Sequence, residues 1–227
     1  MIDAAHPVSV SDLADPSFSG RTQRQRVRLT LHTALAQRIF KGAPDGPVGI
    51  MQFARMVQRI WVASAQDDPY ADLFLLRIYD AIIRARRRFQ QWEREYTEQL
   101  LQHTQVSPVV APLQIPLALS TPYAFMAVYL LVDLDVLTQV LDNLEQCALI
   151  SKTHRLQKSR LLVRDVRRIF SQPLLWRNTG VTRQDIQQGT AKALLARQQM
   201  GALDKQIVLR EVELPYSPAR KLPYRAV

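Results

Sequence analysis

The sequence predicts a mainly α-helical protein that contains one or two short β-strands. The 227 residues include only 7 glycines, and alanine, leucine, arginine and glutamine are abundant, which favours helix. In several long segments apolar residues recur every three or four positions, as on the buried face of an amphipathic helix. Two short segments alternate between apolar and polar residues instead, which is typical of strands. With 47% hydrophobic residues, the chain can build one sizeable core, or a core with an appended lobe.

The first of these alternating segments lies near the N-terminus and reads RQRVRLTLHT over residues 24–33. A period of two predicts a strand over 24–32 with one buried face. The apolar face would hold Val27, Leu29 and Leu31, and the polar face Arg26, Arg28, Thr30 and His32. Arginines on the open face of a strand are typical of a β-ribbon that reads DNA. Charge that protects an edge strand from aggregation is the alternative.

Two helices are expected directly after this strand. Thr33 is an N-cap residue for a short helix that Gly42 would end, and a turn cluster at 42–47 leads into a helix from about 49 to 66. Strand, helix, turn and helix is the order of a ribbon-helix-helix protein, in which two protomers pair their strands and place the ribbon in the major groove. Residues 24–66 are therefore predicted to form a ribbon-helix-helix-like DNA-binding element of a homodimer. Its base-facing side chains would be Arg26, Arg28 and Thr30, because arginine pairs with guanine and threonine contacts bases or the thymine methyl group.

The charge of the chain is strongly positive and unevenly distributed. Thirty lysines and arginines against 20 acidic residues give a net charge of +10, and basic residues are concentrated in 21–41, 84–88 and 151–170. Such blocks suit a polyanion such as double-stranded DNA, because each neutralised phosphate releases counterions. Solvated basic helix faces without a ligand are the alternative. The candidates for contacts to the DNA backbone are Arg24, His32, Arg86, Arg87, Arg88, Arg164 and Arg168.

A helical body is expected over residues 67–202. Asp67, Asp68 and Pro69 provide favourable initiation chemistry for its first helix, which would run to about residue 103. Prolines then interrupt the chain, and residues 106–120 fit a second extended segment, held to a sheet edge. Pairing of this segment with the strand 24–32 in the same chain would weaken the case for a ribbon shared between two subunits.

Three further helices are expected in this body. One would run from 122 to about 150, a basic amphipathic helix would cover 151–171, and the last would run from Thr182 to about Met200. Thr182 and Asp185 form a helix-start pattern, and Gly189 is a weak point. The flanking segments 1–23 and 203–227 are predicted to be a flexible tail and a mobile basic tail.

Several classes of chemistry have no support in the sequence. There is no glycine-rich phosphate loop, the four histidines lack metal-ligand spacing, and the single cysteine excludes an intrachain disulfide. We therefore expect no enzyme activity, no cofactor and no metal. The N-terminus lacks the pattern of a signal peptide, and no uninterrupted apolar run reaches the length of a membrane span. The expected location is cytoplasmic and nucleoid-associated, without a membrane partner.

Four motifs resemble a known group of proteins. LTLHT (29–33), QDDPYAD (66–72), STPYAFMAVYLLVDLD (120–135) and GVTRQDIQQG (180–189) are similar, in this order, to proteins of integrating conjugative elements that are related to AcaB-like transcriptional regulators. The resemblance spans about residues 20–202. It implies a DNA-binding regulator that promotes expression of conjugative-transfer genes, with a ribbon-helix-helix element in a larger helical body. The matching positions for DNA contact would be Arg26, Arg28 and Thr30.

Two other functions fit the same sequence. The long helices could serve a non-enzymatic scaffold or DNA-processing accessory protein of the conjugative machinery, which would bind element-encoded protein partners. A nonspecific nucleic-acid packaging protein would show a steep salt dependence without preference among sequences.

Overall fold

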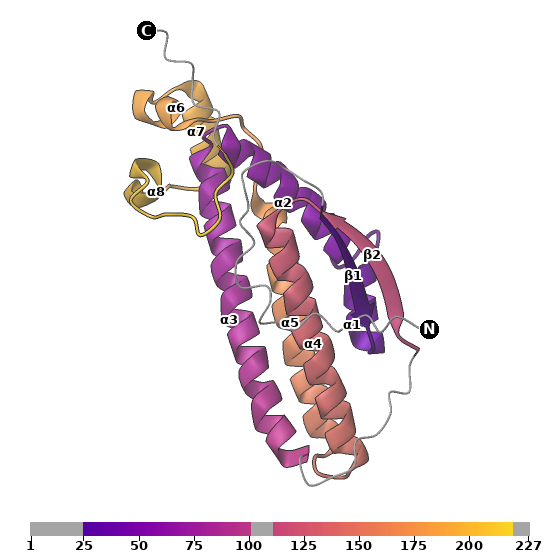
Figure 1. Cartoon of the computed structure of the whole chain (residues 1–227). Coiled ribbons are helices and arrows are strands. Elements are labelled where there is room, and N and C mark those ends of the chain that lie inside the picture. Colours follow the sequence, from indigo (N-terminus) through magenta and orange to yellow (C-terminus); the bar gives the residue numbers. More distant parts are fainter. Residues whose placement is uncertain (1–24, 101–110, 220–227) are drawn as a thin grey trace.

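The computed structural model describes residues 25–100 and 111–219. Three long helices form a bundle, α3 (Pro69–Leu100), α4 (Pro122–Gln146) and α5 (Lys152–Ser171). α2 (Ile50–Ala65) crosses one end of the bundle, and the short helix α1 (Ala34–Lys41) lies along its flank beside a two-stranded sheet (Figure 1). The mainly α-helical prediction is confirmed.

The centre of the bundle is α4, which packs against α1, α2, α3 and α5. Its mean hydropathy reaches 1.8 over 18 residues, so that by length and composition it could cross a membrane. Here, however, 67% of that window is buried inside the fold, as expected for the core helix of a bundle. Its buried face includes Tyr123, Leu130, Leu134 and Leu141, each fully buried.

Hydroxyl caps define where most helices begin. The Thr33 and Thr121 side chains accept hydrogen bonds from Ala36 N and Ala124 N, and so satisfy backbone donors that a helix start leaves free. Helix α2 starts without a side-chain cap at Gly49. Gly42 and Gly49 lie so close that a Cβ on Gly42 would be 2.4 Å from Gly49 N, and Gly42 also has a φ of +64°. This tight turn between α1 and α2 therefore requires glycine at both positions.

The basic strand β1 (Gln25–Leu31) pairs antiparallel with β2 (Leu113–Leu119) of the same chain. The predicted second extended segment is thereby confirmed within 113–119. The order β1, α1, α2 matches the predicted element. The expected pairing of two β1 strands from two subunits is not found in this sheet, because β1 pairs with a strand 82 or more residues further along its own chain. The reason is that β2 carries its own apolar face, with Leu117 and Leu119 buried beside Leu29 and Leu31, and both strands seal the same core.

The C-terminal part differs from the prediction in two respects. The expected helix 182–200 is divided into α6 (Arg183–Gln188) and α7 (Ala191–Met200), because Gly189 adopts a left-handed conformation with φ +65° and ends α6. Residues 203–219, expected within a mobile tail, instead include α8 (Lys205–Leu209). They pack onto the bundle, where the Tyr123 hydroxyl donates to Tyr216 O at 2.9 Å. A short 3-10 helix, η2 (Gln172–Leu175), connects α5 to this region.

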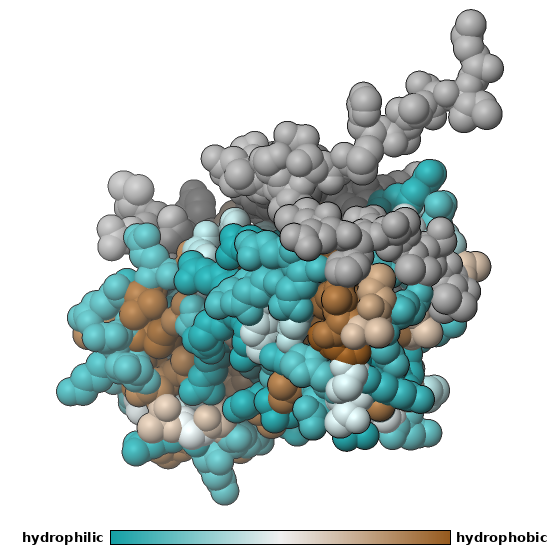
Figure 2. All heavy atoms as spheres, turned by 90° about the horizontal axis from the view of Figure 1, so that it is seen from below, coloured by the Kyte–Doolittle hydropathy of each residue, from teal (hydrophilic) through white to brown (hydrophobic). Residues whose placement is uncertain are grey.

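The surface of the bundle end is predominantly polar. Figure 2 views the molecule from below and shows brown apolar areas separated by teal hydrophilic side chains where described residues form this face. The larger exposed hydrophobic side chains include Leu175, Leu194 and Leu209, on η2, α7 and α8.

Candidate nucleic-acid interface

The β1–β2 ribbon has one apolar face and one polar face, as the alternation of its sequence predicts. Leu29 and Leu31 are 2% and 0% exposed, whereas Arg28 is exposed and Thr30 is half-buried. Across the ribbon, Arg28 lies opposite Pro116 and Thr30 lies opposite Gln114. Opposite residues of an antiparallel pair point to the same face, so the open face combines a guanidinium, a hydroxyl and a carboxamide. These are groups that hydrogen-bond to base edges in the major groove.

The other residues predicted to contact DNA from this segment are distributed differently. Arg26 belongs to β1 and stands opposite Ala118 in the register, which places it in line with Arg28 and Thr30 along the strand. Arg24 lies outside the described residues. Arg28 makes no ion pair with the described part of the chain, so its guanidinium is available to a ligand.

The end of β1 is fixed by a carboxylate from the core helix. Asp135 of α4 is 2% exposed, and its two oxygens accept from His32 N (2.8 Å), Thr33 N (2.8 Å) and Thr33 Oγ1 (2.7 Å). His32 Nδ1 is also 3.1 Å from Asp135 Oδ2. Hydrogen bonds to a charged acceptor are the stronger kind, so Asp135 locks the junction between β1 and α1 against the bundle. His32, predicted to contact the DNA backbone, is in part committed to this carboxylate.

Sequence reasoning had no local signal for the role of Asp135. It lies two residues from Asp133 in an apolar helix. In the structure Asp133 pairs with Arg86 at 2.6 Å, whereas Asp135 contacts the junction between β1 and α1. The one hint in the sequence was the presence of aspartates in an otherwise apolar helix, because a carboxylate that becomes buried requires hydrogen-bond donors.

The basic cluster of α3 is separated from the ribbon. Figure 1 shows α3 on the side of the bundle away from β1 and β2. Arg86 is held by Asp133, and Arg88 forms an ion pair with Asp165 of α5. Arg87 is exposed and makes no ion pair with the described residues. The structure therefore does not bring Arg86, Arg87 and Arg88 together with the ribbon.

The basic residues of α5 lie closer to the N-terminal element. Arg164 is exposed and lies beside a cavity that His32 and Thr33 also line. Its Nε is 3.9 Å from Oδ1 of Asp165, a half-buried carboxylate that also pairs with Arg88, so the contact with Arg164 is long and weak. Arg168 is exposed without an ion pair to the described chain. Of the predicted backbone contacts on α5, Arg168 thus has no ion pair within the described residues, and Arg164 has only this long contact.

The comparisons with known proteins agree with the resemblance seen in the sequence. The profile of the transcriptional regulator AcaB matches residues 20–220. The chain belongs to the AcaB family of transcriptional regulators. A crystal structure of selenomethionine-containing AcaB from uropathogenic E. coli matches with a TM-score of 0.61, at 11% sequence identity, over 82% of this chain and 96% of that one. At this identity the match shows a shared fold. No curated protein matches the chain.

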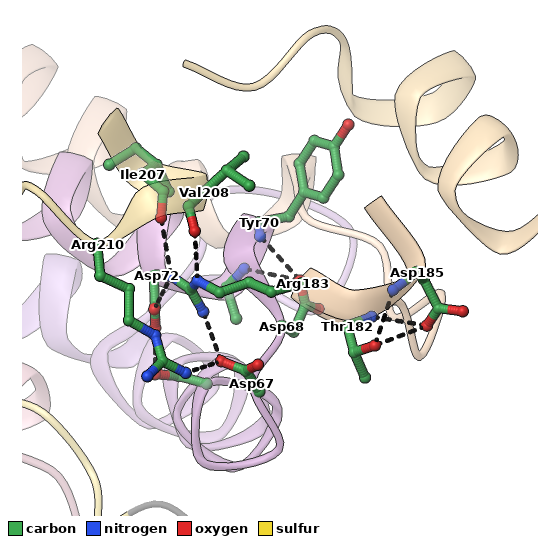
Figure 3. A network of polar contacts seen from close by, with 12 residues as sticks. Asp67, Asp68, Tyr70, Asp72, Thr182, Arg183, Asp185, Ile207, Val208 and Arg210 are labelled. Atoms are coloured by element: carbon green, nitrogen blue, oxygen red, sulfur yellow. Dashed lines mark hydrogen bonds and ion pairs between the residues drawn. The ribbon is translucent and has the colours of Figure 1, made fainter. Parts of the chain in front are cut away.

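Two of the motifs by which the chain resembles the AcaB family meet in space (Figure 3). Arg183 of the GVTRQDIQQG motif donates to Asp67 Oδ1 at 2.8 Å and Asp72 Oδ2 at 2.7 Å, both in the QDDPYAD motif. Its remaining donors reach Val208 O and Ile207 O of α8, at 3.2 and 2.9 Å. The guanidinium, whose side chain is 8% exposed, therefore fastens α6 and α8 to the start of α3. Its partners mark it as a structural residue and not as a ligand contact.

The same cluster contains a carboxyl group with a shifted pKa. Burial raises the pKa of Asp68 to about 6, although the backbone N–H groups of Ala71 and Tyr70 oppose the shift. Asp68 is 2% exposed and caps α3 through Oδ1, while its Oδ2 has no partner among the described residues. No group of three metal-ligating side chains occurs in the described ranges.

Proposed function

We propose that this AcaB-family protein is a sequence-specific, double-stranded-DNA-binding regulator of conjugative-transfer genes of an integrating conjugative element. The observation that carries the proposal is the exposed Arg28, without an ion pair to the described chain, on the open face of a ribbon whose other face is sealed into the core. A two-stranded ribbon fits the width of the major groove. Arg26, Arg28 and Thr30 lie every second residue along the strand, which would direct them to successive base edges. The implied location is cytoplasmic, at the nucleoid.

The architecture also supports a homodimer. β1 pairs with β2 on one edge, and no other strand among the described residues pairs with its second edge. Proline is tolerated on an edge strand where its nitrogen faces outward, so Pro116 suits β2 to the outer position. Antiparallel pairing of β1 with β1 of a second copy at this edge would form a symmetric homodimer.

The direct test is DNA binding by the full-length protein and by the double variant Arg26→Ala, Arg28→Ala. DNA upstream of the transfer genes competes with scrambled duplexes at constant salt. Loss of a base contact costs about 1–3 kcal/mol of discrimination, so the double variant should bind both duplexes equally and still fold. Arg94→Ala, an exposed arginine on α3, is the control and should retain preference. Retained preference in the double variant would overturn this mode of reading.

Target genes require a separate experiment. Chromatin immunoprecipitation from cells that carry the element should give one sharp sequence motif upstream of transfer genes. Recovery of element-encoded proteins with no enriched DNA would favour the scaffold function instead, and enrichment without a motif would favour nonspecific packaging.

A further inference from the structure

A cavity of about 970 Å³ lies between α1, α4 and α5, next to the point where β1 ends. His32 and Thr33 of the β1–α1 junction form part of its lining, and Gln139 and Asn143 of α4 form another part. A volume of this size is typical of sites for small molecules. The cavity is distinct from the open face of the ribbon, because Arg28 and Thr30 do not line it.

The lining of this cavity is rich in positive charge. It contains a single carboxylate, Asp142, and the five arginines Arg38, Arg155, Arg160, Arg164 and Arg167. Arg155 is neutralised by Asp142 at 3.2 Å and by Glu145, and Arg164 approaches Asp165. Arg38, Arg160 and Arg167 make no ion pair with any described residue. The cavity therefore presents three cationic groups, from two helices, that lack a counter-ion within the described chain.

Two buried polar atoms at the same wall also lack partners. Ser159 is 8% exposed, and its Oγ has no hydrogen-bond partner in the described chain. The same holds for Arg167 Nε. Both atoms have almost no solvent-accessible surface, so they lie behind the cavity wall and do not face the space that a ligand would fill. Leu35, Leu156 and Val163 line the space as well and supply apolar contact.

We infer that this cavity binds a small organic anion that carries phosphate groups on an apolar or aromatic body. Arginine is the residue best suited to phosphate, because its planar guanidinium donates two parallel hydrogen bonds. The leucine and valine side chains would contact the body of the ligand. The phosphates of a DNA duplex lie on a convex surface, which does not match a concave space between three helices.

The position of the cavity gives the bound anion a route to the ribbon. His32 and Thr33 line the cavity and are also the residues through which Asp135 fixes the end of β1. A ligand beside this junction would alter the orientation of β1 and hence affinity for DNA. This consequence rests on the proposed function, whereas the binding site itself does not.

The test uses inorganic pyrophosphate and adenosine triphosphate as probes, with the full-length protein and no DNA. Isothermal titration at constant ionic strength should show saturable binding of both probes at one site per chain, with the nucleotide the tighter because it also contacts the apolar wall. Absence of saturable binding of both probes would overturn the inference. Because DNA is not present, this result is independent of whether the ribbon reads DNA.

Two exposed arginines from different helices provide variants that should fold. Arg38→Ala and Arg160→Ala each remove a charge-assisted hydrogen bond, so each should weaken pyrophosphate binding about tenfold or more. Arg94→Ala has the same charge change away from the cavity and should bind as the parent does. If Arg160→Ala keeps full pyrophosphate binding but loses affinity for duplex DNA, Arg160 is a DNA contact and the inference is wrong.

Discussion

Arg183 and Asp72, 111 residues apart in the sequence, form a buried ion pair in which Arg183 Nη2 lies 2.7 Å from Asp72 Oδ2. The two side chains are 8% and 5% exposed. Asp72 also accepts a hydrogen bond from Ser64 Oγ of α2, so the pair connects α2, α3, α6 and α8. Loss of one partner of a buried pair is costly because the other charge stays buried without compensation.

We therefore expect Arg183→Ala to lower the free energy of unfolding by about 3–5 kcal/mol. The loss should be accompanied by faster amide hydrogen exchange in α6 and α8, which Arg183 fastens to α3. Arg210→Ala is the control: Arg210 also contacts Asp67, but its side chain is 42% exposed, and an exposed pair contributes about 1 kcal/mol or less. Urea titration measures both variants. Equal losses would show that burial of Arg183 is not what matters.

Local patterns predicted the elements of this fold, and long-range contacts escaped prediction. Thr33 and Thr182 are helix caps because their side chains accept hydrogen bonds from residues three positions away, and that information is contained in the adjacent sequence. The alternation around Leu29 correctly identified the buried and open faces of β1. The sequence left two possible partners for β1, the same strand of a second subunit or the extended segment 106–120 of its own chain. The alternation of apolar and polar residues does not say which strand completes a sheet.

The interactions that hold the candidate interface in place have no local signature. Asp135 caps a junction 103 residues away from it, and nothing near either segment indicates the match. The basic runs gave a similar ambiguity: Arg86 and Arg87 are neighbours in sequence, yet one pairs with Asp133 and the other is exposed. The packing of α3 against α4 determines which of the two arginines is paired, because it brings Arg86 next to Asp133 and leaves Arg87 exposed.

Asp135→Asn should loosen the ribbon without dismantling the bundle. The amide keeps one acceptor oxygen but loses the charge and the second acceptor, so stability should fall by about 1–3 kcal/mol. Hydrogen exchange should increase in β1 and in the first turn of α1, and specific DNA affinity should fall. Asp133→Asn, two residues away on the same helix, disturbs the contact with Arg86 and should leave exchange in β1 unchanged. A variant of Asp135 with parental exchange in β1 would contradict this role.

Asp68 should make stability depend on pH in a defined window. Its folded pKa is about 6 against an ordinary value of 3.8. Between these values the unfolded chain releases the proton while the folded chain keeps it, so stability falls as pH rises through this range. The shift corresponds to about 3 kcal/mol, fully lost above the folded pKa.

Asp68→Asn should therefore be more stable than the parent at pH 7.5, by up to about 3 kcal/mol, and equally stable below pH 4. The asparagine keeps the oxygen that caps Tyr70 N and Ala71 N. Asp204→Asn is the matched control, since Asp204 also caps a helix but is exposed. Urea titrations from pH 3.5 to 8 measure the difference. Parallel pH profiles for Asp68→Asn and the parent would refute the assignment.

Contacts to the DNA backbone should come from α5 and not from α3. Arg168 is exposed on α5 without an ion pair to the described chain, and Arg164 is held only by the 3.9 Å approach to Asp165. Removal of one cation that neutralises a phosphate reduces the slope of log K against log salt by about 0.9. Arg164→Ala and Arg168→Ala should each reduce the slope by this amount and weaken binding to all sequences alike.

The comparison with α3 decides this last prediction. Arg87→Ala removes the same charge from an exposed position on α3, the helix that Figure 1 shows across the bundle from the ribbon, and it should leave the slope unchanged. Anisotropy titrations at four salt concentrations measure the slopes for all three variants. If Arg87→Ala lowers the slope as much as Arg168→Ala does, the DNA covers both sides of the bundle, and a complex confined to the ribbon and its adjoining helices is excluded.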